Sequence, residues 1–256
     1  MKLQTVLFWF FSKFCASKSG VRLLYGCGLY TDVYGTPPAP DITLMTDSSL
    51  KGWRGVIEGT PNLTGGRWSY QESKFHINYL ELNAILLALQ SLCNHMQCCH
   101  IKLLYDNTTA VSYISNLGGT KARVCNEVTW EIIRWCMARH LTLSVNHFPG
   151  KLDAEADRAS RVFHNSNTEW SMAPSVFNKL TAKWGELDDI ATFASRLNYK
   201  VFQYVAWKPD PGAIAIGAFT LDWYKLICNI YISCSCWNSN YWKSTLTFPY
   251  QPEEVH

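Results

Sequence analysis

The chain has 256 residues, of which 48% are hydrophobic and 17% are charged, and its net charge is +3 at pH 7. This composition supports a packed core and excludes a wholly disordered chain, and the length suits one large domain or two small ones. No apolar run is long enough to span a membrane, so we expect no membrane partner.

The first 40 residues carry little pattern. An apolar stretch after Lys2 resembles a short secretory signal, but Ser12 and Lys13 interrupt its end. Glycine and proline residues between 20 and 40 indicate a linker. The ten cysteines include no pair of Cys-x-x-Cys units, which favours scattered free thiols over a structural zinc site. We therefore expect an intracellular protein, in the cytoplasm or nucleus. The alternative is a secreted, cysteine-containing protein.

Residues 41–161 show the clearest periodicity. Short runs separated by turn residues predict three strands, near 42–47, 52–57 and 66–70. Apolar residues at helical spacing predict a helix over 78–95, which Asn78 can cap. Further along, we expect strands at 100–105 and 141–147 and helices at 108–116, 124–139 and 152–161. This order predicts an α/β fold with a mixed five-stranded sheet and helices on both faces.

Four carboxylates occupy notable positions in this pattern. Asp47 and Asp106 end predicted strands, Glu81 lies in the first turns of the long helix, and Asp157 lies in the last helix. Such a cluster can hold two divalent cations about 4 Å apart, which is a site for in-line phosphodiester cleavage. Residues 41–161 contain 12 Lys and Arg against 11 Asp and Glu, so without these four acids the balance is 12 against 7. A mildly basic balance suits an enzyme that binds a polyanion.

Several ordered segments carry a resemblance to a known family. They are Thr46-Asp47-Ser48-Ser49, His76-Ile77-Asn78-Tyr79-Leu80-Glu81-Leu82, Tyr105-Asp106-Asn107-Thr108-Thr109-Ala110-Val111, His147-Phe148-Pro149-Gly150-Lys151 and Ala156-Asp157-Arg158-Ala159-Ser160-Arg161. In these segments the chain resembles the ribonuclease H domain of reverse transcriptases from DIRS-type retrotransposons. The resemblance continues through Glu169-Trp170, the run from Phe193 to Asn198, and Ala218-Phe219. Any one motif is weak evidence, but together and in this order they are specific.

The resemblance gives the expected domain organisation. Residues 1–40 are an unassigned N-terminal segment and linker, and residues 41–161 form a ribonuclease H-like domain. Residues 162–223 form an irregular, retroelement-type C-terminal appendage, and residues 224–256 are an unassigned tail.

The resemblance also implies an activity, which is metal-dependent hydrolysis of the RNA strand of an RNA–DNA hybrid. It implies two Mg²⁺ ions, with Mn²⁺ as an alternative metal. Asp47 is then expected to bridge both metals, Glu81 and Asp106 to complete one site, and Asp157 to complete the other. The chain has no polymerase motif with paired aspartates, so a separate polymerase domain is an expected partner besides the hybrid.

Other residues join the expected site, some with an open alternative. His147 matches a mobile histidine that shuttles a proton, or it is a polar residue at a strand end. Asn78 contacts the minor groove of the hybrid, or caps its helix, or does both. Lys121 and Arg123 contact phosphates, or form a solvated basic loop. The resemblance also implies that Ser48 and Asn107 bind substrate.

The sequence departs from the family pattern at three positions. Asp153 stands where Asn is common, which adds a negative charge near the expected metals. Ala191 and Gly217 stand where we expect acids in the appendage. The two lost acids, the missing polymerase motif and the unmatched ends of the chain favour the alternative function, a catalytically inactive nucleic-acid-binding remnant of a retroelement.

Overall fold

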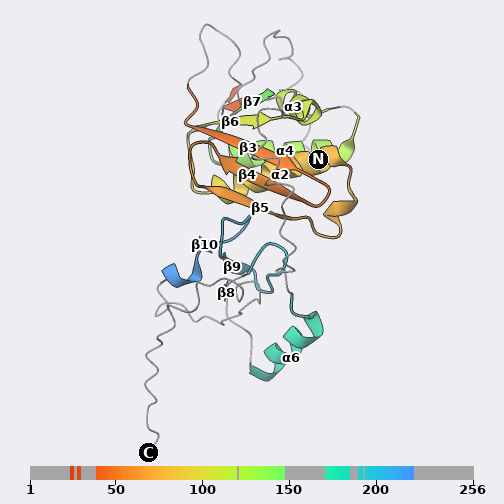
Figure 1. Cartoon of the computed structure of the whole chain (residues 1–256), viewed down its shortest axis with the longest axis vertical. Helices are drawn as coiled ribbons and strands as arrows, with labels where there is room; N and C mark the ends of the chain where they lie inside the picture. Colours follow the sequence, from red (N-terminus) through yellow and green to blue (C-terminus); the bar gives the residue numbers. More distant parts are fainter. Residues whose placement is uncertain are drawn as a thin grey trace, which may run out of the picture. The chain divides into compact units, whose positions relative to one another are not determined.

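A mixed β-sheet with helices packed on it forms the first part of the chain. The computed structural model describes residues 24–25, 28–29, 39–119, 121–147, 171–184, 190–192 and 194–221. The chain divides into one unit of residues 1–163 with 209–211 and a second unit of residues 164–208 with 212–256. The elements of the first unit are β1 (Leu24–Tyr25), β2 (Gly28–Leu29), β3 (Ile42–Ser48), β4 (Gly52–Ile57), β5 (Leu63–Arg67), η1 (Glu72–Lys74), α2 (Ile77–Leu92), β6 (His100–Tyr105), α3 (Thr108–Ser115), α4 (Arg123–Met137) and β7 (Thr142–His147) (Figure 1).

The sheet has the strand order β2-β1-β7-β6-β3-β4-β5. Strands β3, β4 and β5 form an antiparallel meander, and β3, β6 and β7 run parallel. The five strands β3 to β7 are therefore the mixed sheet that the sequence predicts. The two-residue strands β1 and β2 extend it beyond β7. Both lie in the segment that we expected to be a linker. The sequence did not predict them, because strands of two residues show no detectable period.

The third strand lies earlier than predicted. We expected residues 66–70, but β5 spans Leu63–Arg67 and ends where Arg67 pairs with Gly52, the first residue of β4. Beyond that pair the ladder has no partner strand, and Trp68 instead donates its indole N–H to the Ser49 carbonyl oxygen at 2.7 Å. The start of the partner strand β4 therefore determines where β5 ends.

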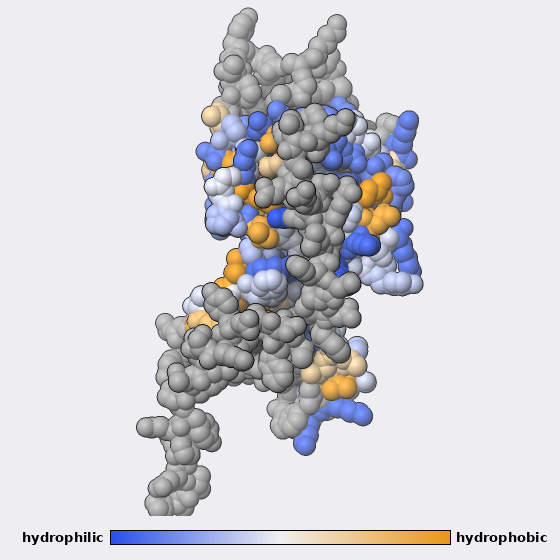
Figure 2. Space-filling model, viewed as in Figure 1, coloured by the Kyte–Doolittle hydropathy of each residue, from blue (hydrophilic) through white to orange (hydrophobic). Residues whose placement is uncertain are grey.

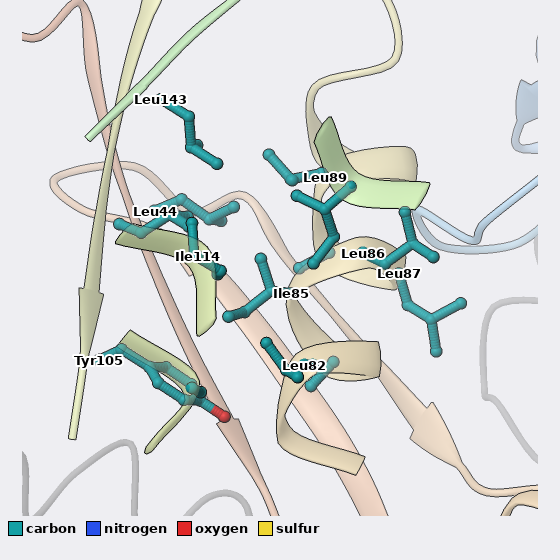
Figure 3. Packing of buried hydrophobic residues seen from close by; sticks show 14 of the residues in the cluster. Leu44, Leu82, Ile85, Leu86, Leu87, Leu89, Tyr105, Ile114 and Leu143 are labelled. Carbon is teal, nitrogen blue, oxygen red and sulfur yellow. The ribbon is translucent and has the colours of Figure 1, made fainter. Parts of the chain in front are cut away.

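One face of the sheet is buried under all three described helices of the first unit. Alternate strand residues such as Leu44, Leu103 and Leu143 join residues of α2, α3 and α4 in one apolar core. Figure 3 shows Leu44 and Leu143 of the sheet and Ile85 of α2 among the side chains of this layer. Helix α2 lies so near β4 that a Cβ at Gly55 would come within 2.6 Å of the Ala88 Cβ. The helix expected at 152–161, which would cover the other face, lies outside the described residues.

The second unit is more regular than the irregular appendage that we expected. It contains α6 (Pro174–Trp184), β8 (Ile190–Thr192), β9 (Gln203–Ala206), β10 (Ala215–Ile216) and η3 (Ala218–Thr220). The three strands form a parallel sheet in the order β10-β9-β8. Tyr204 and Ala206 are buried in its small core. The sequence did not predict these strands, because strands of two to four residues give no periodic signal.

Polar and apolar side chains alternate over the visible surface of the described residues (Figure 2). Among the helices of the described ranges, none is both long and apolar enough to cross a membrane.

Candidate functional site

Two of the predicted acids meet at one edge of the sheet. Asp47 is the next-to-last residue of β3, and Asp106 directly follows β6. Because β3 and β6 are parallel neighbours, their carboxyl ends lie at the same edge, where open α/β sheets commonly bind ligands. Asp47 is half-buried and Asp106 is exposed.

Glu81 reaches this edge from the first turns of α2. It is a charged residue in an otherwise apolar layer, with 6% of its surface exposed. Burial, and after it the negative charges of Asp47 and Asp106, raise the pKa of the Glu81 carboxyl from 4.5 to about 8. The neighbouring Ser48 and Asn107 side chains partly offset this pKa rise. Without a cation nearby, Glu81 is therefore protonated at neutral pH.

Unpaired polar atoms are concentrated at the same edge. In the described part of the chain, six buried side-chain atoms have no hydrogen-bond partner, and all belong to the ends of β3 and β6, the start of β4, or Glu81. They are Thr46 Oγ1, Ser48 Oγ, Trp53 Nε1, Arg54 Nε, Glu81 Oε2 and Tyr105 Oη. Buried polar groups are nearly always paired, so a cluster of exceptions indicates a place where ions or water belong.

The residues fit a divalent cation in donor type and charge. The carboxylates and the unpaired hydroxyls offer oxygen atoms, which Mg²⁺ and Mn²⁺ prefer. A cation would also relieve the repulsion among Asp47, Glu81 and Asp106. Within the described ranges, however, no three His, Cys, Asp or Glu side chains gather closely enough to form a metal-binding set. Asp157, the fourth expected ligand, lies outside the described residues, as does Asp153.

Asn107 links Asp106 to the helix that follows. Its Oδ1 accepts hydrogen bonds from the backbone N–H groups of Thr109 at 2.9 Å and Ala110 at 3.1 Å, so it caps α3. The side chain also lies beside Glu81, as Ser48 does. Ser48 and Asn107, which we expected to bind substrate, thus lie next to the Glu81 carboxyl group and can orient it.

His147 lies at the site. It pairs in register with Tyr105, the last residue of β6, and is exposed. Its Nε2 lies 3.1 Å from the carbonyl oxygen of Asp106, to which it can donate. This position is compatible with both roles expected for His147, a proton shuttle and a strand-end polar residue.

The expectation that Asn78 caps α2 is wrong. The helix begins at Ile77 and its N-cap is His76, whose Nδ1 accepts from the backbone N–H of Asn78 at 3.2 Å. His76 takes this role because its backbone is extended, whereas Asn78 is already helical. The side chain of Asn78 is therefore not used as the cap, and a contact with substrate is its other expected role.

Lys121 and Arg123 lie on the segment that leads into α4, apart in sequence from the strands that carry the acids. Both are exposed, and Arg123 Nε donates to Glu127 at 2.8 Å across one helical turn. An exposed pair of this kind contributes little to stability and does not prevent contact with a phosphate.

Sequence reasoning missed Arg54, Trp53 and Tyr105. Arg54 is a charged residue inside the short strand Gly52–Ile57, and its charge within a strand was the sequence signal that could have marked it as a candidate site residue. A scan of protein-family models and a search of curated proteins give no match to this chain.

Proposed function

We propose that this chain is a metal-dependent ribonuclease H that hydrolyses the RNA strand of RNA–DNA hybrids, as part of a DIRS-type retrotransposon reverse transcriptase. The observation that carries the proposal is the electrostatic interaction of buried Glu81 with Asp47 and Asp106, together with the unpaired buried oxygens, at one edge of the sheet. The strand order and the placement of the three acids are compatible with a ribonuclease H-like fold.

Four carboxylates would hold the metals, namely Asp47, Glu81, Asp106 and Asp157. Two Mg²⁺ ions, or Mn²⁺, would supply the positive charge that activates the attacking water and stabilises the leaving 3′ oxygen. Glu81 must give up its proton before it can act as a ligand, because burial and its acidic neighbours hold its pKa near 8. Ser48 and Asn107 favour the ionised form and orient it. His147, exposed beside Asp106, is placed to carry a proton to or from the reacting strand.

Substrate and partners follow from this chemistry. The hybrid would be recognised by its shape and its 2′-hydroxyl groups rather than by base sequence. Asn78, Lys121 and Arg123 are the residues proposed to contact it. A separate polymerase domain would produce the hybrid. The chain would act in the cytoplasm or nucleus, where free thiols stay reduced.

The second candidate is an inactive remnant that binds nucleic acid without cutting it. The observation that favours it is the absence of a closely gathered set of metal ligands in the described ranges. Ala191 and Gly217, which stand where we expected acids in the second unit, also favour the inactive remnant.

Cleavage of a hybrid with a labelled RNA strand separates the two candidates. The full chain is incubated with Mg²⁺, with Mn²⁺, or with EDTA, alongside Asp106→Asn. We expect cleavage with either metal, none with EDTA, and a loss of at least about 10³-fold in Asp106→Asn, since the metal charge supplies much of the rate. Binding of the hybrid without cleavage by a folded parent chain would support the remnant instead.

A further inference from the structure

Arg54 lies opposite Asp47 in the sheet. The register of β3 and β4 pairs the two residues directly, and side chains so paired have Cβ atoms roughly 5 Å apart on the same face. The next residue, Gly55, faces α2, since a Cβ there would meet Ala88. Side chains alternate along a strand, so Arg54 and Asp47 both lie on the face turned away from α2.

The surroundings of Arg54 leave one of its donors unpaired. Arg54 Nε is buried and has no hydrogen-bond partner. It therefore does not donate to Asp47, although Asp47 is its neighbour in register. On its other side Arg54 pairs with Gly65 of β5, which has no side chain to offer an acceptor. A buried guanidinium N–H without an acceptor is costly, and its natural complement is an anionic oxygen.

A phosphate group is the anion that fits this position. The guanidinium is planar, always charged, and presents donors in a fork that matches two phosphate oxygens. We propose that Arg54 binds a backbone phosphate of the nucleic acid and so positions the strand beside Asp47, Glu81 and Asp106. This inference rests on the proposed function, because the acids provide the place at which a phosphodiester would be cut. Arg54 is then a substrate-positioning residue with no sequence preference.

The competing role for Arg54 is that of a counter-charge for the carboxylates. In that role its removal would change the Mg²⁺ concentration required for activity, because the acids would repel one another more strongly. It would leave the number of phosphate contacts unchanged. The salt dependence of binding reports that number, because each phosphate neutralised by a protein cation releases counterions.

The test measures the affinity of the full chain for an RNA–DNA hybrid as a function of salt, in the uncleaving Asp106→Asn background. Arg54→Gln is compared with Arg54→Lys, which keeps the charge but not the fork, and with Arg134→Gln. Arg134 is an exposed arginine on α4 and serves as the matched control. Thermal unfolding of each variant checks that it is folded.

We expect Arg54→Gln to bind roughly 10-fold more weakly and to lower the slope of log K against log salt by about 1. Arg54→Lys should keep the slope and lose only part of the affinity, and Arg134→Gln should match the background chain. An unchanged slope and affinity in Arg54→Gln would overturn the assignment, and so would a change confined to the Mg²⁺ requirement of cleavage in the otherwise native chain. Failure of the parent chain both to bind and to cleave hybrid would overturn the proposed function, and this inference with it. Normal cleavage and binding by Arg54→Gln would overturn this inference alone.

Discussion

The two ends of the parallel strands differ in how their polar groups are satisfied. At the amino end, the Asp41 carboxylate accepts from the backbone N–H of His100 at 2.6 Å, and the His100 Nε2 lies 2.8 Å from the Ser144 hydroxyl. At the carboxyl end, burial and then the charges of Asp47 and Asp106 raise the pKa of Glu81. The six unpaired buried atoms of the described residues all lie at that second end.

This contrast shows that the fold is able to pair buried polar groups where nothing else has to bind. The amino end uses ordinary residues, a carboxylate, an imidazole and a hydroxyl, and leaves them paired. At the carboxyl end, like charges and unpaired donors persist in the same sheet, which costs stability. Unpaired buried groups and repelling charges that lower stability are typical of functional sites.

The largest expected effect compares the same substitution at the two ends of β3. Asp47→Asn should reduce hybrid cleavage by about 10³-fold or more, because it removes a proposed bridging ligand. Asp41→Asn should leave the Mg²⁺-dependent rate within about twofold and cost roughly 1 kcal/mol of stability. Cleavage rates and chemical unfolding measure both. Equal loss of activity in the two variants would contradict the contrast.

The second prediction concerns the pH dependence set by Glu81. Its folded-state pKa, about 8, lies above its ordinary value of 4.5, so the folded state without metal binds the proton more tightly. The stability that this group contributes is thus full below pH 4.5 and is lost as pH rises through 8. Glu81→Gln should remove this dependence and be more stable than the parent at pH 8 to 9 in EDTA, by about a few kcal/mol at most.

Metal binding reverses this trend. Since the metal requires ionised Glu81, the Mg²⁺ affinity of the parent should increase up to tenfold per pH unit until about pH 8. Glu81→Gln should bind Mg²⁺ weakly and without this pH dependence. Unfolding temperatures across pH, with Mg²⁺ and with EDTA, test both parts. The same pH profile in parent and variant would show that another group is responsible.

A third prediction pairs two buried serines. Ser144→Ala removes a partner from buried His100 and should cost about 1–3 kcal/mol. Ser48→Ala removes a hydroxyl that makes no hydrogen bond of regular geometry but favours the ionised form of Glu81. It should leave the metal-free stability unchanged at neutral pH, where Glu81 is protonated. It should also raise the pKa of Glu81 further, because Ser48 lowers that pKa in the native chain. Chemical denaturation measures the sign of each change, and a similar cost for both serines would remove the distinction between the two ends.

The smallest effect separates the two roles of Asn107. Asn107→Ala loses the cap of α3 and should cost about 1 kcal/mol, whereas Asn107→Ser keeps a cap and should cost a few tenths. Both variants lose the amide beside Glu81, so both should require more Mg²⁺ for cleavage. Retention of the native Mg²⁺ requirement by Asn107→Ser would limit this residue to capping.

Much of the first unit was predictable because its elements are long enough to be periodic. The helix around Leu82 and Ile85 and the strands that end near Asp47 and Asp106 appear within a few residues of their predicted bounds. Errors occurred where a neighbour sets the boundary. Pairing with β4 ends β5 at Arg67, earlier than predicted, and the extended backbone of His76 moves the cap of α2 away from Asn78.

The sequence alone determined the order of the strands and helices from β3 to β7 and the identity of the acids, because hydrophobic periodicity and local motifs depend on neighbouring residues. Only the tertiary structure decided that Glu81 is buried, with a raised pKa, where it faces Asp47 and Asp106. It also decided that Arg54, in an unremarkable strand, lies opposite Asp47. Strand register and burial depend on contacts between residues far apart in the chain, and so a linear pattern does not contain them.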